Sequence, residues 1–215
     1  MAKTDNVAVA TTLLEEFTEA KVKELIELRP WMKTKRFRLL SKQRDIEEFF
    51  DECIKKGRCS YDLETTGLNT RIDPSDGLCY AKIVGICVSH DPDEGAYIPI
   101  AHEHADNYNV PLKFVIRETK RLAANCVLIF HNFKYDGAIL RPHGVVFESE
   151  DQYEDTYLMA AIQDASRKEK GLKYLSGALL DRPQLEIDDL GIQGTAKNTV
   201  AFYLVPPQKA VFYGG

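Results

Sequence analysis

The order of the predicted strands and helices is the feature that most constrains how this chain folds. Strands are predicted one after another over residues 59–68, 81–90 and 96–100, with turn-forming residues between them. After Pro111 the hydrophobic pattern becomes helical, and a short apolar strand is predicted at 126–130 between two helices. Consecutive strands favour an antiparallel meander of three strands, to which the later helices and strands are added. The sequence therefore predicts an α/β domain with a mixed sheet flanked by helices.

Two further helices are predicted before this region. Residues 11–29 place four apolar side chains on one helical stripe that ends at Pro30, which indicates a leading helix that docks on the domain or serves a partner, with docking as the default. The stripe consists of Leu14, Phe17, Leu25 and Leu28. Residues 36–41 predict a strand, after which Ser41 is placed to cap a helix that Gly57 ends. The remaining predicted elements are a strand at 145–149 and helices at 156–166 and 171–180.

Composition and charge narrow the possible functions. The hydrophobic fraction of 44% is that of a globular protein, and no apolar run approaches the roughly 20 residues that a transmembrane helix needs. The N-terminal residues lack the basic-then-apolar order of a secretion signal, so we expect a cytoplasmic protein without a membrane partner. A net charge of −5 argues against broad, charge-driven coating of duplex DNA but leaves room for a local nucleic-acid groove.

The cysteines are odd in number, and none of them forms a CxxC pair. This pattern favours reduced thiols in the core over a zinc site or disulfide bonds. The five residues are Cys53, Cys59, Cys79, Cys87 and Cys126.

Two acids interrupt the apolar alternation of the first strand in the meander. Asp62 and Glu64 are separated by one leucine, so both carboxylates project from the same face of the strand. Like charges held that close repel each other, and the flanking apolar and small residues make a plain solvent face less natural. A second polar cluster lies at 131–136, where a strand passes into a helix, and sites tend to form at such junctions. There Asp136 compensates the helix dipole and Asn132 caps the helix, unless both belong to a site.

Taken together and in this order, these segments resemble a known family. The stretches YDLETTGL (61–68) and HNFKYDGAIL (131–140) resemble the first two motifs of the DEDD 3′→5′ exonuclease superfamily, and in detail the proofreading domain of a phage-like family A DNA polymerase. The resemblance continues in EDTYLMAAIQDA, GLKYLSGALL and FYLVPPQKAVFYGG. It implies a ribonuclease H-like fold and an exonuclease domain over residues 36–215, preceded by an N-terminal helical extension at 1–35.

The resemblance also implies a site for two divalent metal ions, Mg²⁺ or Mn²⁺. By the family's pattern Asp62 bridges both ions, Glu64 holds the ion that activates water, and Asp136 holds the second ion through water. The chemistry agrees, because phosphodiester hydrolysis needs a hydroxide nucleophile and neutralised phosphate charge, which two ions about 3.5–4 Å apart supply. Hard cations prefer oxygen ligands, so carboxylates suit them.

A tyrosine late in the chain completes the implied catalytic set. The tyrosine branch of the superfamily ends in Tyr-x-x-x-Asp, in which the tyrosine orients the attacking water and the aspartate is the fourth ligand. Tyr213 stands at the tyrosine position, with a core aromatic as the alternative, but the matching aspartate would fall beyond Gly215. We therefore expect a domain truncated before the last motif aspartate, with Tyr213 on a poorly ordered terminus. Asp155 and Asp164 are the acids to test if a fourth ligand comes from inside the chain, although Asp155 is expected to cap its helix.

Four residues match family positions that contact the substrate strand. Leu68 matches a leucine that wedges against the terminal base, and a core leucine is the alternative. Asn132 and Tyr135 match positions beside the strand, while Lys134 meets a phosphate or is solvated. A basic cluster before the first motif is expected to be a solvated face, with a nucleic-acid rim as the alternative. Its members are Lys33, Lys35, Arg36 and Arg38.

These features predict an enzyme that removes 3′-terminal nucleotides from single-stranded or frayed DNA, as in proofreading, beside a polymerase domain of the same or a partner chain. A mismatched end unpairs more easily, so it reaches the site as a single strand. One alternative is a catalytically silent domain kept for docking or single-strand binding, and a weaker one is an RNA-trimming nuclease related to ribonuclease D. If the gene is phage-encoded, we expect the protein in the cytoplasm of the host.

Overall fold

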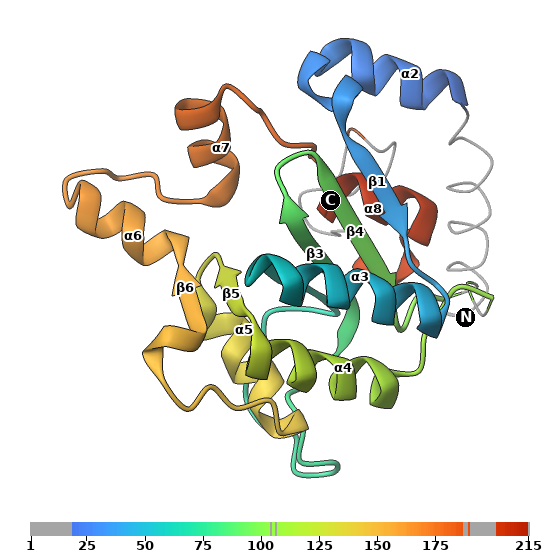
Figure 1. Ribbon diagram of the computed structural model, residues 1–215, viewed down its shortest axis with the longest axis vertical. Coiled ribbons are helices and arrows are strands. Elements are labelled where there is room, and N and C mark those ends of the chain that lie inside the picture. Colours follow the sequence, from blue (N-terminus) through green and yellow to red (C-terminus); the bar gives the residue numbers. More distant parts are fainter. Residues whose placement is uncertain (1–18, 104, 106, 187–188, 190–200, 215) are drawn as a thin grey trace.

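A six-stranded mixed sheet forms the centre of the protein (Figure 1). The computed structural model describes residues 19–103, 105, 107–186, 189 and 201–214. In spatial order the strands are β1 (Arg36–Leu39), β4 (Glu94–Pro99), β3 (Ile83–Asp91), β2 (Arg58–Thr65), β5 (Val127–Phe130) and β6 (Tyr153–Asp155). Strand β3 pairs antiparallel with β2 and with β4, whereas the β1–β4, β2–β5 and β5–β6 pairs are parallel. The predicted α/β fold with its antiparallel three-strand meander is therefore confirmed.

Helices cover both faces of this sheet (Figure 1). The α-helices are α2 (Glu19–Leu28), α3 (Gln43–Lys56), α4 (Leu112–Asn125), α5 (Phe133–Leu140), α6 (Thr156–Gln163), α7 (Leu172–Leu180) and α8 (Pro207–Gly214). The short 3₁₀-helices are η1 (Pro30–Thr34), η2 (Arg141–His143), η3 (Glu150–Gln152) and η5 (Phe202–Leu204). Helix α3 packs on α4 and on β2 and β3, while α8 contacts β4, β1 and β3. None of the described helices is long and apolar enough to cross a bilayer.

Two hydrophobic clusters share the buried side chains of the sheet. Ile86 and Val88 of β3 belong to the first cluster, together with side chains of α3 and α4. Cys87, between them, belongs to the second cluster, which includes Ala210 and Val211 of α8. Because successive side chains of a strand point to opposite faces, the two clusters lie on opposite sides of β3. The sequence of a strand that is buried on both faces is a continuous apolar run, as it is at residues 83–88.

The ends of helix α3 show which local signals the fold uses. Gly57 follows the helix in the left-handed conformation, with φ of 78°, and its N–H donates to the Cys53 and Ile54 carbonyls. The predicted glycine stop is confirmed, because glycine adopts this conformation without steric strain. The predicted N-cap is wrong, since the cap position falls on Lys42 instead of Ser41 and no side chain caps the helix.

The strand predicted at 145–149 is absent, and the last strand of the described sheet is β6 instead. Val145 is buried in the first cluster and Phe147 packs against other rings, whereas Val146 is 59% exposed. The Phe147 ring lies 5.1 Å from the Phe133 ring and 5.6 Å from the Tyr153 ring, between centroids. A short apolar run therefore indicated burial here but not strand pairing.

The leading helix docks on the second cluster, although its stripe differs from the prediction. Leu25 is buried there, whereas Leu28 is 65% exposed. After α2 ends, the chain turns through η1, and Met32 takes a place in the second cluster. Leu14 and Phe17 lie outside the described residues.

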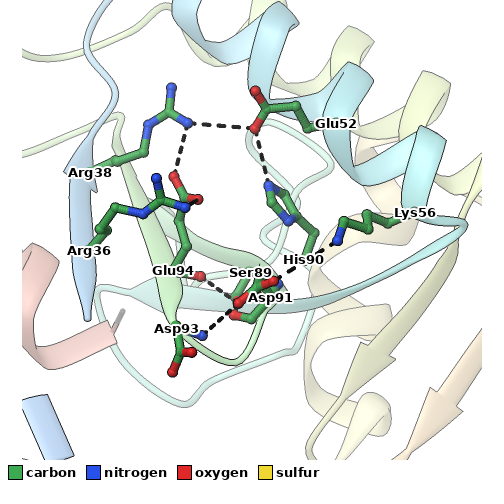
Figure 2. Close-up of polar contacts among 9 residues, drawn as sticks. All are labelled: Arg36, Arg38, Glu52, Lys56, Ser89, His90, Asp91, Asp93 and Glu94. Carbon is green, nitrogen blue, oxygen red and sulfur yellow. Dashed lines mark hydrogen bonds and ion pairs between the residues drawn. The ribbon is translucent and has the colours of Figure 1, made fainter. Parts of the chain in front are cut away.

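The basic segment before β2 is held by acidic side chains of the fold (Figure 2). Arg36 and Arg38 both donate to the carboxylate of Glu94, over 2.8 and 3.0 Å, and Glu94 is only 6% exposed. Lys35 pairs with Asp93, and Arg38 also lies 3.6 Å from Glu52. These contacts tie the parallel strands β1 and β4 together. Three of the four predicted basic residues therefore compensate buried and surface acids, which argues against the nucleic-acid rim, while Lys33 is exposed.

A glycine in β3 makes room for a large buried ring of β4. A Cβ atom at Gly85 would lie 1.9 Å from the Tyr97 hydroxyl oxygen and 2.3 Å from the ring carbon that carries it. Tyr97 is completely buried, so the ring cannot move aside into solvent. The fold therefore requires glycine at position 85.

We predict that Gly85→Ala lowers the free energy of unfolding by about 1–3 kcal/mol, the usual result of overpacking a core. Gly67→Ala is the matched control, because a Cβ there meets nothing within 4 Å, and its effect should stay below about 0.5 kcal/mol. Urea unfolding at equilibrium measures both. Equal stability of the two variants would show that the Tyr97 ring does not need the space above Gly85.

Candidate metal centre

Strand β2 turns two carboxylates to one side because its apolar residues fill the other. Tyr61 and Leu63 are buried in the first cluster, so the alternating positions face away from that core. Asp62 and Glu64 occupy those positions and line a cleft of about 590 Å³. The predicted convergence of these two acids on one face is thereby confirmed.

The cleft lies between the sheet and the helical segments that follow it in sequence. Strands β2, β3 and β5 form its floor, and residues of α6, α7 and α8 line it too. Lys173 of α7 and Tyr213 of α8 line the same space as the acids. The cleft thus combines negative, positive and phenolic groups that come from distant parts of the sequence.

Asp136 approaches the acid pair from the first turn of helix α5. Its side chain is 2% exposed, and one carboxylate oxygen accepts a hydrogen bond from the Leu63 N–H, over 3.1 Å. Leu63 lies between Asp62 and Glu64, so this bond fixes the third acid against the same stretch of strand. One side-chain hydrogen bond thus joins two residues that lie more than seventy positions apart in the sequence.

Crowding and burial make these acids hard to ionise. Burial raises the pKa of Glu64 to about 8, with help from the charges of Asp62 and Asp136, while Lys173 opposes the rise. Burial and the Asp62 charge raise the pKa of Asp136 to about 8 as well. Asp62 lies at the solvent-exposed end of the site, so the surrounding protein raises its pKa less, to about 6, and solvent weakens this effect further. Three such groups are ionised together only if positive charge joins them, and a divalent cation would supply it.

The last helix brings Tyr213 to the cleft. The Tyr213 ring centroid lies 5.5 Å from that of Phe202, and the Lys173 Nζ lies 5.0 Å from the Tyr213 centroid. The side chain is half-buried and packs against the second cluster while lining the cleft. The expectation of a poorly ordered terminus is wrong for residues 207–214, because α8 packs on β4, β1 and β3.

A chain of buried hydrogen bonds holds the segment just before α8. The His102 Nδ1 donates to the Val205 carbonyl over 2.6 Å, and its Nε2 accepts from the Tyr97 hydroxyl, also over 2.6 Å. Burial lowers the pKa of His102 to about 4, although the bond to Val205 opposes this shift. A neutral ring with one donor and one acceptor nitrogen suits both bonds. This link fixes where α8, and with it Tyr213, meets the sheet.

The loop after β2 presents Leu68 to solvent. Leu68 is 85% exposed, so the core position considered for it is wrong. The Tyr135 hydroxyl donates to the Gly67 carbonyl over 2.7 Å and lies 2.5 Å from the Thr65 hydroxyl. Tyr135 therefore holds the loop that carries Leu68. Lys134 is exposed on the same helix, where it is free to meet solvent or a ligand.

Asp155 caps two helices at once. Its carboxylate accepts from the Tyr157 and Leu158 N–H groups at the start of α6, over 2.9 and 3.4 Å. It also accepts from the Asn132 and Phe133 N–H groups at the start of α5, both over 3.0 Å. The predicted capping role is confirmed and extended to a second helix. Asn132 occupies the N-cap position of α5 with φ of 71°, but its side chain makes no capping bond, so that prediction is wrong.

Three residues of the site were missed in the sequence. Lys173 lies inside a quoted motif, but nothing in the motif indicated that its side chain meets the acids. His102 follows β4 and had no local signal, since its partners are a tyrosine and a distant carbonyl. Cys87 is the cross-strand partner of Asp62, and only the strand register shows this.

We predict that Asp155→Ala lowers the free energy of unfolding by about 2–3 kcal/mol, because two helix starts lose their cap. Asp164→Ala is the control, since the Asp164 side chain bonds locally to Ser166 and should matter by less than about 1 kcal/mol. Thermal and urea unfolding measure both variants. If Asp155→Ala instead keeps full stability and loses Mn²⁺-induced stabilisation, Asp155 is a metal ligand and not a cap.

A pH dependence of stability follows from the raised pKa of Glu64. In metal-free buffer the folded protein holds a proton on Glu64 up to about pH 8, whereas the unfolded chain releases it near its ordinary value of 4.5. Stability from this group is therefore complete below pH 4.5 and is lost as the pH rises through 8. Glu64→Gln should remove this loss and stabilise the metal-free protein above pH 8 by about 1–2 kcal/mol relative to wild type. Glu148→Gln, at an exposed position, should leave the pH profile of urea unfolding unchanged.

The chain is similar to a family of nucleases and to a DNA polymerase. A family described as 3′-5′ exonuclease matches residues 37–199. DNA polymerase I of Borreliella burgdorferi is 26% identical over 156 residues, a match that covers 72% of this chain and 16% of that polymerase. The chain thus spans less than a fifth of the curated relative that it matches.

One solved structure shares the fold at low sequence identity, and a second is reported beside it. The apo form of a nuclease is 16% identical, with a TM-score of 0.50 over 84% of this chain and 76% of that chain. Escherichia coli RNase D, described as an exoribonuclease, is 13% identical, with a TM-score of 0.49 over 82% of this chain and 44% of that chain. The first of these likenesses supports the ribonuclease H-like fold, and neither bears on the substrate.

Proposed function

Because the chain belongs to the 3′-5′ exonuclease family of family A DNA polymerases, we propose that it removes nucleotides from the 3′ end of single-stranded DNA as a proofreading domain. The observation that carries the proposal is that Asp62 and Glu64 line one cleft while Asp136 is bonded to the strand residue between them, with the pKa of each acid raised. An all-oxygen set of crowded acids suits hard divalent cations such as Mg²⁺ or Mn²⁺. The residues present therefore fit the metal ions that the family uses.

The proposed site assigns two metal ions to these three acids. Bound there, the ions would supply an activated water and neutralise the charge of the scissile phosphate. Asp62 and Glu64 hold their ligand oxygens from the strand face, and Asp136 approaches from helix α5. One Asp136 oxygen accepts from the Leu63 N–H, and the carboxylate would offer a further lone pair to a metal ion or to its water.

The remaining site residues orient the reactants. We assign to Tyr213 the orientation of the attacking water, because its ring lines the cleft and is held by α8. Lys173, which pairs with Glu186, lines the same cleft, where its ammonium group is assigned to the phosphate. Small misplacements of a nucleophile can slow a reaction about a hundredfold, so the packing of α8 matters for rate.

Substrate contacts are proposed at the exposed loop and at the start of α5. Leu68 is exposed and is assigned to wedge against the terminal base. Asn132, Lys134 and Tyr135 are assigned to the strand beside it, with Tyr135 also holding the Leu68 loop. A frayed end offers unstacked bases to such apolar and aromatic contacts, whereas a paired end does not.

We also propose a division of the chain into a helical extension at 1–35 and the exonuclease domain at 36–215. Leu25 and Met32 of the extension are buried with residues of β4 and α8. The described part of the extension therefore covers the second cluster. The relative found by sequence is a whole polymerase, and a polymerase domain of the same or a partner chain is therefore the proposed functional partner.

The test is digestion of a 5′-labelled single-stranded DNA in Mg²⁺ and in Mn²⁺. We expect shortening from the 3′ end, slower attack on a blunt duplex, and a loss of at least about a hundredfold in Asp62→Asn. Asp164→Asn is the matched control and should keep full activity, because Asp164, considered above as an internal fourth ligand, does not line the cleft and bonds locally to Ser166.

Other outcomes separate the alternatives. Single-strand binding without any shortening would indicate the silent module, and faster shortening of RNA than of DNA would indicate an RNA-trimming nuclease. Equal attack on blunt duplex and single strand would remove the proofreading assignment.

A further inference from the structure

A thiol lies among the carboxylates of the cleft. Cys87 of β3 is the cross-strand partner of Asp62, so both side chains project from the same face of the sheet. The Cys87 side chain is 4% exposed, and its Sγ lies 3.9 Å from the Glu64 Oε1. This Sγ and one carboxylate oxygen from each of Asp62 and Glu64 all lie within 4.8 Å of one another. Within the part of the chain that the structure describes, no other three cysteine, histidine or acidic side chains form such a group.

The spacing of these donors matches a small tetrahedral metal site. Zinc bonds to sulfur at about 2.3 Å and to carboxylate oxygen at about 2.0–2.2 Å, so neighbouring donors of a tetrahedron lie about 3.5 Å apart. The separation of 3.9 Å between Cys87 and Glu64 is close to this value. Rotation of exposed Asp62 would close the remaining distance, since its side chain has free space in the cleft.

We propose that Asp62, Glu64 and Cys87 form a binding site for a thiophilic divalent cation, of the class of Zn²⁺, Co²⁺ and Cd²⁺, which competes with the Mg²⁺ or Mn²⁺ of the nuclease. This inference rests on the metal centre assigned under the proposed function and adds a sulfur ligand to it. Hard cations bind the carboxylates and leave the thiol protonated, whereas a thiophilic cation replaces the thiol proton, which passes to solvent. Three protein ligands leave a fourth position for water, as in an open zinc site.

Among the described residues, the other four cysteines belong to no such group of metal-binding donors. Cys53, Cys59 and Cys126 are buried in the first cluster, where Cys126 Sγ lies 3.8 Å from Cys59 Sγ. Cys79 is also buried and bonds to the Thr70 and Ala138 carbonyls. Cys87 differs because its sulfur faces carboxylate oxygens inside a cleft.

The experiment is a titration of the full chain with Co²⁺, followed by absorption spectroscopy and by thermal unfolding. Wild type should develop a near-ultraviolet thiolate-to-cobalt charge-transfer band, and Cys87→Ser should lack it. Cys79→Ser is the matched control and should keep the band, because a serine hydroxyl can donate to the same two carbonyls. The apparent dissociation constant for Zn²⁺ in competition with Co²⁺ should rise at least about tenfold in Cys87→Ser. Mn²⁺-induced stabilisation should persist in that variant, because the carboxylates that bind hard cations are still present.

The outcomes distinguish this inference from the proposed function. Co²⁺ binding without the band in wild type, or a band that persists in Cys87→Ser, overturns the sulfur ligand while Mn²⁺ stabilisation still supports the carboxylate site. Absence of stabilisation by both Mn²⁺ and Co²⁺ overturns the metal centre itself. If Cys87→Ser does not fold, Cys87→Ala takes its place under the same criteria.

Discussion

The hydrogen bond between the Leu63 N–H and the Asp136 carboxylate is the contact on which the site depends. It joins helix α5 to strand β2 and brings a third acid to two that the strand already holds together. Two further contacts hold helix α5 in place beside β2. Asp155 caps α5 and α6, and Tyr135 of α5 bonds to the loop after β2. Repulsion among the acids is thus opposed by hydrogen bonds from uncharged N–H and O–H groups.

The wall of the cleft opposite the acids depends on a second buried link. Gly85 leaves space for the Tyr97 ring, the Tyr97 hydroxyl reaches His102, and His102 reaches the carbonyl of Val205 before α8. Each step uses a group that is neutral around physiological pH, so the link does not compete with the charges in the cleft. The position of Tyr213 therefore depends on packing and hydrogen bonds made by residues that are distant from it in the sequence.

The sequence predicted the parts of the structure that have local causes. The two-residue spacing of Asp62 and Glu64 requires one shared face, and Gly57 supplies the left-handed conformation that ends a helix. The errors arose where distant packing decides the outcome. Residues 145–149 contain a run as apolar as a strand, but Phe147 packs among aromatic rings and no ladder forms. The position of Cys87 opposite Asp62 follows only from the register of two paired strands.

The central claim is that Asp62, Glu64 and Asp136 hold divalent metal at the cleft. Anomalous X-ray diffraction from crystals soaked in Mn²⁺ tests it most directly, because it locates manganese independently of activity. The account predicts two anomalous peaks about 3.5–4 Å apart, with Asp62 and Glu64 carboxylates as ligands and Asp136 adjacent. A cleft without any anomalous peak, or manganese bound only elsewhere on the protein, would contradict it.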